Sequence, residues 1–203
     1  MPYILGITGN IATGKSTAAD FFKERGVPVW SADFAVHDLY ENDKDLIKSF
    51  RSFMPKAVIA DKIDRTKLRQ ELINNPNILQ KLEAIVHPKT ATHRDSFLKI
   101  HKNAMMVIFD IPLLYEKNLA YLVDGVLVMA IDKETQKKRA LKRKTLNENQ
   151  LDVIMKNQMP LKEKTSMADF VIESLSLDHV NNEIEKLYNR IKKQSHDNAR
   201  NRS

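Results

Sequence analysis

Two glycines, a lysine and three hydroxyl residues stand together near the start of the chain, in the stretch GNIATGKST at residues 9–17. Their spacing fits G-x-x-x-x-G-K-[ST], with Gly9, Gly14, Lys15 and Ser16 at the fixed positions. In this pattern backbone N–H groups surround phosphate, the lysine reaches the β- and γ-phosphates, and the serine hydroxyl can bind Mg²⁺. We expect the N–H groups from Ile11 to Ser16 to point inward. The residues predicted to bind a nucleoside triphosphate are Gly9, Asn10, Ile11, Ala12, Thr13, Gly14, Lys15, Ser16 and Thr17.

Asp33 is the next candidate, in the stretch VPVWSADFAVHDLY. It follows a predicted strand, and ligands of open α/β sheets bind at the carboxyl edge of the strands. A kinase that acts on an alcohol needs a carboxylate to orient the attacking hydroxyl and accept its proton. The alternative is that Asp33 is only the N-cap of the helix that follows, since Asp is favoured there. Its position supports both interpretations about equally.

Asp110 and Glu116 lie in the stretch FDIPLLYE, residues 109–116. Asp110 ends another predicted strand, where such proteins commonly carry a carboxylate for Mg²⁺, bound directly or through water. The alternative is an ordinary aspartate at a strand end. Glu116 is either a second acid or a solvent-facing residue.

Gln136, Arg139 and Arg143 are spaced to form one stripe of a helix, in a basic run. Two guanidinium groups on one face suit the charge that spreads over a transferring phosphoryl group. A solvated basic face is an equally weighted alternative. The histidines show no spacing with acidic residues that would predict zinc.

The elements that must position these residues follow from the hydrophobic pattern. A strand, a glycine turn and a helix with apolar residues at helical spacing surround the loop, which is the context a phosphate site requires. Alternating strands and helices predict an α/β fold with a five-stranded parallel sheet flanked by helices. The predicted strands are Tyr3–Thr8, Val27–Ser31, Met105–Asp110, Gly125–Ile131 and Phe170–Ile172.

The segments between these strands are predicted to be helical. Residues 33–103 show no strand, are broken at Asn75-Pro76 and His87-Pro88, and would form a substrate-binding lobe. Helices at about 133–144 and 147–158 would form a lid. A final helix, Leu177–Lys193, carries one apolar stripe. We therefore expect a single domain over residues 1–195, with its core in 1–32, 104–132 and 168–195, and a disordered tail at 196–203.

Composition limits the functional class. The chain has 203 residues, no cysteine, and 33 Lys plus Arg against 26 Asp plus Glu, a net charge of +7. The absence of cysteine, of a signal segment and of a long apolar run favours a cytoplasmic protein without a membrane partner. The basic residues are not interleaved with aromatic ones, which argues against nucleic acid as the main ligand.

Several motifs, in order, resemble the dephospho-CoA kinase family, which are P-loop kinases. They are GITGNIATGKST, SAD ending in Asp33, IDR at 63–65, LEAIVHP at 82–88, DIPLLYE at 110–116, Q-x-x-R-x-x-x-R at 136–143, Gln158 and ADFVI at 168–172.

This resemblance implies transfer of the ATP γ-phosphate to the ribose 3′-hydroxyl of dephospho-CoA. It implies that Asp33 is the base and that Arg139 and Arg143 are lid arginines. It also implies that Arg65 and His87 help to hold dephospho-CoA. The expected partners are these small molecules, with a monomer favoured and an oligomer left open.

The chain departs from the family pattern in three places. In the loop, which in the family usually reads GGIGSGKS, this chain has Asn10, Ala12 and Thr13 in place of the second Gly, the third Gly and the Ser. In the DAD motif, Ser31 replaces the first acid. The glycine that commonly precedes IDR is also absent. The alternatives are another small P-loop kinase, acting on a nucleoside or nucleotide, and a regulatory NTPase that uses ATP as a switch.

Overall fold

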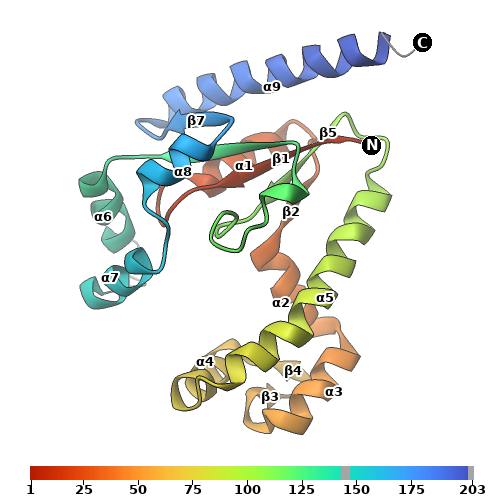
Figure 1. Cartoon of the computed structure of the whole chain (residues 1–203), viewed down its shortest axis with the longest axis vertical. Helices are drawn as coiled ribbons and strands as arrows, with labels where there is room; N and C mark the ends of the chain where they lie inside the picture. The colour runs from red at the N-terminus through yellow and green to blue at the C-terminus, as the bar shows by residue number, and fades with distance from the viewer. Residues whose placement is uncertain (143–146, 201–203) are drawn as a thin grey trace. The chain divides into compact units, whose positions relative to one another are not determined.

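The computed structural model of the chain describes residues 1–142 and 147–200, with side chains described up to residue 194. These residues form two compact units (Figure 1). The first unit comprises Met1–Val29 and His101–Ser203, and the second comprises Trp30–Ile100. Within the described residues, no helix is long and apolar enough to cross a membrane.

A parallel sheet forms the centre of the first unit. Strand β1 (Tyr3–Thr8) pairs with β5 (Met106–Asp110) on one side and with β6 (Gly125–Ala130) on the other. Strand β7 (Phe170–Glu173) pairs with β6, and β2 (Val29–Ser31) completes the five-stranded order β2-β5-β1-β6-β7. All five predicted strands are confirmed, with ends that differ by at most two residues. Because β1 is central, the loop that follows it leaves from the middle of the sheet.

Helices α1 (Lys15–Glu24) and α9 (Leu177–Arg200) cover this sheet with a common apolar core. The predicted apolar stripe of the last helix is confirmed, because its four members are all buried. They are Val180, Ile184, Leu187 and Ile191. Helix α9 continues to Arg200, past Lys193, where the helix was predicted to end. It is the long blue helix of Figure 1.

The region between β6 and β7 contains α6 (Lys133–Lys142), α7 (Glu148–Lys156) and α8 (Leu161–Met167). The first two correspond to the predicted lid helices. Helix α7 starts at a capping box, in which Asn147 and Gln150 bond each other's backbone N–H. Helix α8 was not predicted, because seven largely polar residues are too few to display an apolar period. A short 3₁₀ turn, η2 (Ala120–Leu122), lies ahead of β6.

The second unit is mostly helical. Its elements are α2 (Ala32–Asn42), α3 (Lys44–Phe53), η1 (Pro55–Ala57), β3 (Val58–Ile59), β4 (Lys62–Ile63), α4 (Arg65–Asn74) and α5 (Ile78–Ile100). They enclose a core of their own, in which Leu46, Phe50 and Met54 are fully buried.

Two predictions about this unit are wrong. The strands β3 and β4 form a small antiparallel hairpin where none was expected, because two-residue strands are too short to show an alternating pattern. Helix α5 runs through Pro88, whereas the sequence predicted a break there. Proline inside a helix removes one backbone hydrogen bond. Burial of Leu82 and Val86 on the preceding turns holds the helix together across this position. The predicted break at Asn75-Pro76 is confirmed.

Candidate active site

The phosphate-binding loop joins the carboxyl end of β1 to the first residue of α1. Gly9 has φ 143° and Gly14 has φ 99°, conformations that other residues rarely adopt. A Cβ on Gly9 would lie 2.5 Å from the backbone oxygen of Met129, and one on Gly14 would lie 2.7 Å from Ser174 Oγ. Gly9 is therefore required by conformation and by the space that backbone occupies, and Gly14 is required by its conformation.

Ala12 replaces a glycine of the family pattern and has φ 60°. Its methyl group is buried against Ala140 of α6 and Leu151 of α7, in a small apolar cluster. The left-handed conformation costs an alanine about 1–2 kcal/mol. Contact between the loop and the two lid helices offsets part of that cost.

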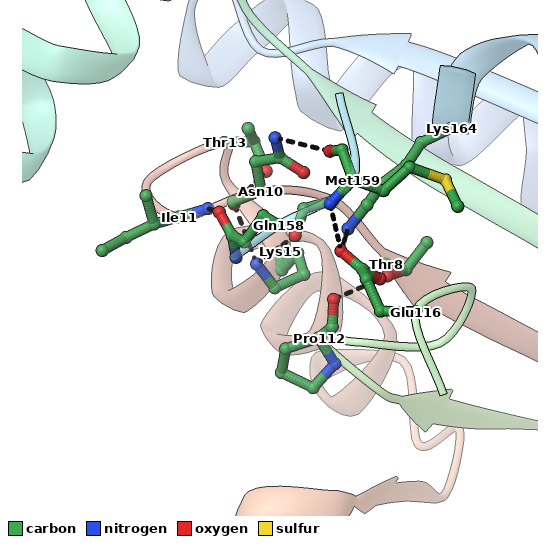
Figure 2. Close-up of polar contacts among 11 residues, drawn as sticks. Thr8, Asn10, Ile11, Thr13, Lys15, Pro112, Glu116, Gln158, Met159 and Lys164 are labelled. Carbon is green, nitrogen blue, oxygen red and sulfur yellow. Dashed lines mark hydrogen bonds and ion pairs between the residues drawn. The ribbon is translucent and has the colours of Figure 1, made fainter. Parts of the chain in front are cut away.

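Lys15 extends its ammonium group back across the loop (Figure 2). Its Nζ donates to the carbonyl oxygens of Gly9 at 2.8 Å and Asn10 at 3.0 Å. Helix α1 begins at Lys15 and its N-cap is Gly14, which has no side chain to bond the N–H groups of the first turn. A helix N-terminus of this kind attracts anions. The loop thus gathers a positive charge and backbone donors at one place, beside the exposed hydroxyl residue Ser16.

The first half of the loop is held by side chains from the lid region. The Gln136 Nε2 donates to the Ile11 carbonyl at 2.9 Å, and the Ile11 N–H donates to Gln158 Oε1 at 3.0 Å. Thr13 is fully buried, and its hydroxyl donates to the Asn10 carbonyl at 2.8 Å. The expectation that the Ile11 N–H points into the phosphate cradle is therefore wrong, because Gln158 accepts it.

Arg139 lies close to the other end of the loop. Its guanidinium donates to Ser174 Oγ at 2.9 Å and to the Leu175 carbonyl at 3.4 Å. Ser174 Oγ is also the atom nearest to the position that a Cβ on Gly14 would take. Arg139 is thus half-buried beside the N-terminus of α1 and is not part of a solvated face. The other predicted lid arginine, Arg143, lies outside the described residues.

Glu116 forms an ion pair that the sequence did not predict. Its Oε1 lies 2.8 Å from the Nζ of Lys164, whose side chain is 0% exposed, and accepts the Met159 N–H at 2.9 Å. Burial raises the pKa of the Glu116 carboxyl. The hydrogen bonds from Lys164 and from the Met159 N–H outweigh this effect and hold the pKa below the ordinary 4.5. Glu116 is therefore a largely buried acid and not a solvent-facing residue.

Asp110 and Ser16 are the predicted metal-binding residues. Asp110 ends β5 opposite Ile7 of β1, and the next residue of β1, Thr8, donates its hydroxyl to the Pro112 carbonyl at 3.0 Å. Carboxylate and hydroxyl oxygens suit Mg²⁺, which usually takes one or two protein ligands together with substrate phosphates and water. The described residues contain no cluster of three or more metal-binding side chains. One carboxylate and one hydroxyl are thus donors of the type that Mg²⁺ uses together with a nucleotide.

The remaining predicted site residues belong to the second unit. Ser31 is the N-cap of α2, where its side chain accepts the Phe34 N–H at 3.4 Å, so the interpretation of Asp33 as the N-cap is wrong. This contact also gives a role to the serine that replaces an acid of the family pattern. Asp33 is exposed in the first turn of α2, Arg65 is exposed at the start of α4, and His87 is exposed on α5.

The loop and its lysine were predicted from the sequence, but the contacts that hold them were not. The spacing of Gln136 and Arg139 predicted one stripe of a helix, but the two side chains contact different groups. Gln136 bonds the Ile11 carbonyl, and Arg139 bonds Ser174 Oγ. Gln158 stood out only through the family resemblance. Lys164 gave no signal at all, because a lysine in a polar segment is ordinarily exposed.

Comparison with known proteins identifies the family. The model of the dephospho-CoA kinase family matches residues 3–179. A dephospho-CoA kinase of Cereibacter sphaeroides is 42% identical over 177 residues, which cover 87% of this chain and 89% of that protein. One from Ruegeria pomeroyi is 38% identical over 192 residues, with coverage of 95% and 97%.

Solved structures agree with these relatives. The dephospho-CoA kinase from Campylobacter jejuni matches with a TM-score of 0.72 at 30% identity, over 96% of this chain and 99% of that one. A crystal structure from Thermus thermophilus matches with a TM-score of 0.83 at 31% identity, over 92% and 96%. Because the family model spans most of the chain and the relatives are matched along nearly their whole length, this chain belongs to the dephospho-CoA kinase family.

Proposed function

We propose how the residues of this chain divide the work of the family reaction, in which ATP phosphorylates dephospho-CoA to give coenzyme A and ADP. The loop of the first unit binds the phosphates of ATP, and Asp33 of the second unit acts on the 3′-hydroxyl of dephospho-CoA. The observation that carries the nucleotide part is the position of the Lys15 ammonium, across the loop carbonyls at the N-terminus of α1.

On nucleotide binding, Lys15 exchanges the carbonyls of Gly9 and Asn10 for oxygens of the β- and γ-phosphates. The exchange keeps the ammonium hydrogen-bonded before and after binding. Arg139 lies beside the same helix end and stabilises charge on the phosphoryl group as it transfers. Ser16 and Asp110 would hold Mg²⁺, which supplies further neutralisation of phosphate charge when it is bound.

Asp33 accepts the proton of the 3′-hydroxyl as that oxygen attacks the γ-phosphorus, and the bond to the β-phosphate oxygen breaks to release ADP. Capping of α2 by Ser31 supports this role, because it leaves the Asp33 carboxylate exposed and not bonded to the helix end. Arg65 and His87 hold the acceptor, whose diphosphate is anionic. We propose that the enzyme works on these small molecules in the cytoplasm, with nucleic acid and membranes playing no part.

The test of the reaction is ADP production from Mg-ATP with dephospho-CoA, adenosine or AMP as acceptor, with the product mass confirmed. We expect turnover with dephospho-CoA alone, and Lys15→Ala serves as the variant that should abolish it. Faster turnover with adenosine or AMP would support a different small kinase. ATP hydrolysis that ignores all three acceptors would support a regulatory NTPase.

The test of Asp33 is the Asp33→Asn variant. Removal of a general base should lower kcat by about 10²–10⁴, with unchanged ATP affinity and melting temperature. The matched control is Ser31→Ala, which removes the α2 cap, costs about 1 kcal/mol of stability and should retain turnover. Near-normal kcat in Asp33→Asn would refute its role as the base.

A further inference from the structure

The buried pair Glu116–Lys164 has no role in the chemistry described so far. Glu116 belongs to the segment after β5 and Lys164 belongs to α8, so the pair joins two distant parts of the first unit. The exposed fractions of their side chains are 15% and 0%. A buried ion pair is weak evidence for stability, because desolvation of both charges offsets their attraction. Its position relative to the loop suggests a different use.

A short series of hydrogen bonds leads from this pair to the phosphate-binding loop (Figure 2). The Glu116 carboxylate accepts the Met159 N–H at 2.9 Å, and the Met159 carbonyl accepts a bond from Asn10 Nδ2 at 3.3 Å. The neighbouring Gln158 accepts the Ile11 N–H through its side chain at 3.0 Å. Gln158 and Met159 thus form hydrogen bonds with two adjacent loop residues, and the Glu116 carboxylate holds Met159 through its N–H.

The segment that makes these contacts has little regular structure to hold it. Residues 157–160 lie between the last residue of α7 and the first residue of α8. Tyr115, next to Glu116, donates its hydroxyl to the Met167 carbonyl at 2.9 Å, which ties the far end of α8 to the same strand exit. The ion pair and this bond therefore anchor α8 at two points, and the anchored helix places the Gln158–Met159 segment against the loop.

We propose that Glu116 and Lys164 are positioning residues for the nucleotide. They hold Met159 and Gln158 in place, and these two residues fix the side chain of Asn10 and the backbone N–H of Ile11. The inference rests on the proposed function only in that the loop binds ATP. Lys15 depends on the same geometry, because its ammonium bonds the Gly9 and Asn10 carbonyls. Loss of the acceptor behind Met159 should therefore loosen the loop and weaken nucleotide binding.

Two double variants separate this role from a general effect of buried charge. Glu116→Gln with Lys164→Met removes both charges but keeps a side-chain oxygen for the Met159 N–H. Glu116→Leu with Lys164→Met removes the same charges and leaves that N–H unsatisfied. The matched control is Glu163→Leu with Lys162→Met, two exposed residues of the same helix.

The measurement is the Kd for ADP, from direct titration of folded protein, together with KM for ATP and for dephospho-CoA. We expect the Leu/Met variant to bind ADP about tenfold more weakly than the Gln/Met variant, the usual effect of one unsatisfied buried group. KM for ATP should rise in parallel, KM for dephospho-CoA should not change, and the control should match wild type. Equal ADP affinity in the two double variants would overturn the proposal.

Glu116→Asp covers the case in which a double variant does not fold. It keeps the charge but withdraws the carboxylate by one methylene, and it should also weaken ADP binding. Unchanged ADP affinity in this folded variant would overturn the proposal as well. Because ADP titration uses no phosphate acceptor, failure of the protein to phosphorylate dephospho-CoA would refute the proposed function without affecting this result.

Discussion

Gly9 can be tested by replacement with alanine, and the structure provides a control in another glycine. Gly9 has φ 143°, and its added Cβ would lie 2.5 Å from the Met129 oxygen and 2.7 Å from Thr13 Oγ1. Gly26 has φ 72° and follows the end of α1, but an added Cβ there would have no atom within 4 Å. The two substitutions therefore share a conformational cost and differ in steric overlap.

The magnitudes follow from these two contributions. The unusual backbone conformation costs an alanine about 1–3 kcal/mol at Gly9 and about 1–2 kcal/mol at Gly26. Overlap adds about 1–3 kcal/mol at Gly9 alone, the usual cost of overpacking a filled interior. Met129 cannot easily move away, because every residue of β6 is buried. We expect Gly9→Ala to lower the free energy of unfolding by about 1–3 kcal/mol more than Gly26→Ala.

The assay is urea unfolding of both variants, followed by far-ultraviolet circular dichroism, with the Kd for ADP measured on the folded proteins. ADP binding should weaken in Gly9→Ala, because the displaced Gly9 carbonyl is an acceptor for Lys15. It should stay at the wild-type value in Gly26→Ala. Equal unfolding free energies in the two variants would refute the argument that the Met129 oxygen excludes a side chain at Gly9.

Two further predictions concern charged groups. Arg139→Ala should lower kcat by about 10²–10³, with a smaller change in KM for ATP. Arg139→Lys should recover only part of the lost kcat, whereas Lys138→Ala, at an exposed neighbour, should behave as wild type. Wild-type kinetics in both Arg139 variants would disprove the lid assignment. Burial raises the pKa of Asp43, but the Leu46 N–H and the Lys89 ammonium outweigh it and lower the pKa below 3.8. Asp43 therefore stabilises the fold above pH 3.8, and this contribution disappears as pH falls through the lowered pKa. Asp43→Asn keeps the α3 cap but loses the ion pair, so its melting temperature should lie below that of wild type at pH 6. The difference should shrink as the pH falls below 3.8, and a difference that does not change with pH would contradict this origin.

Features of this protein that depend on neighbours in the chain could be predicted from the sequence. The glycine spacing requires a tight turn with positive φ, and both Gly9 and Gly14 adopt it. The apolar runs predicted all five strands because a strand buried on both faces has no polar alternation. The stripe on α9 followed from the helical period. In each case the physical cause acts within a few residues.

Features that depend on distant partners were decided only by the tertiary structure. Asp and Ser are both favoured as N-caps, so residue type alone does not decide between Asp33 and Ser31. The backbone places Ser31 at the N-cap position of α2, where its side chain accepts the Phe34 N–H. Pro88 should end a helix by local rules, yet α5 continues through it, and the buried residues Leu82 and Val86 lie on the turns before it. The contacts of Ile11 with Gln136 and Gln158 join residues more than a hundred positions apart. Lys164 is buried next to Glu116, a partner that only the folded chain brings to it. Burial of a charge is costly without such a partner, and the residues around Lys164 in the sequence do not indicate which residue the partner is.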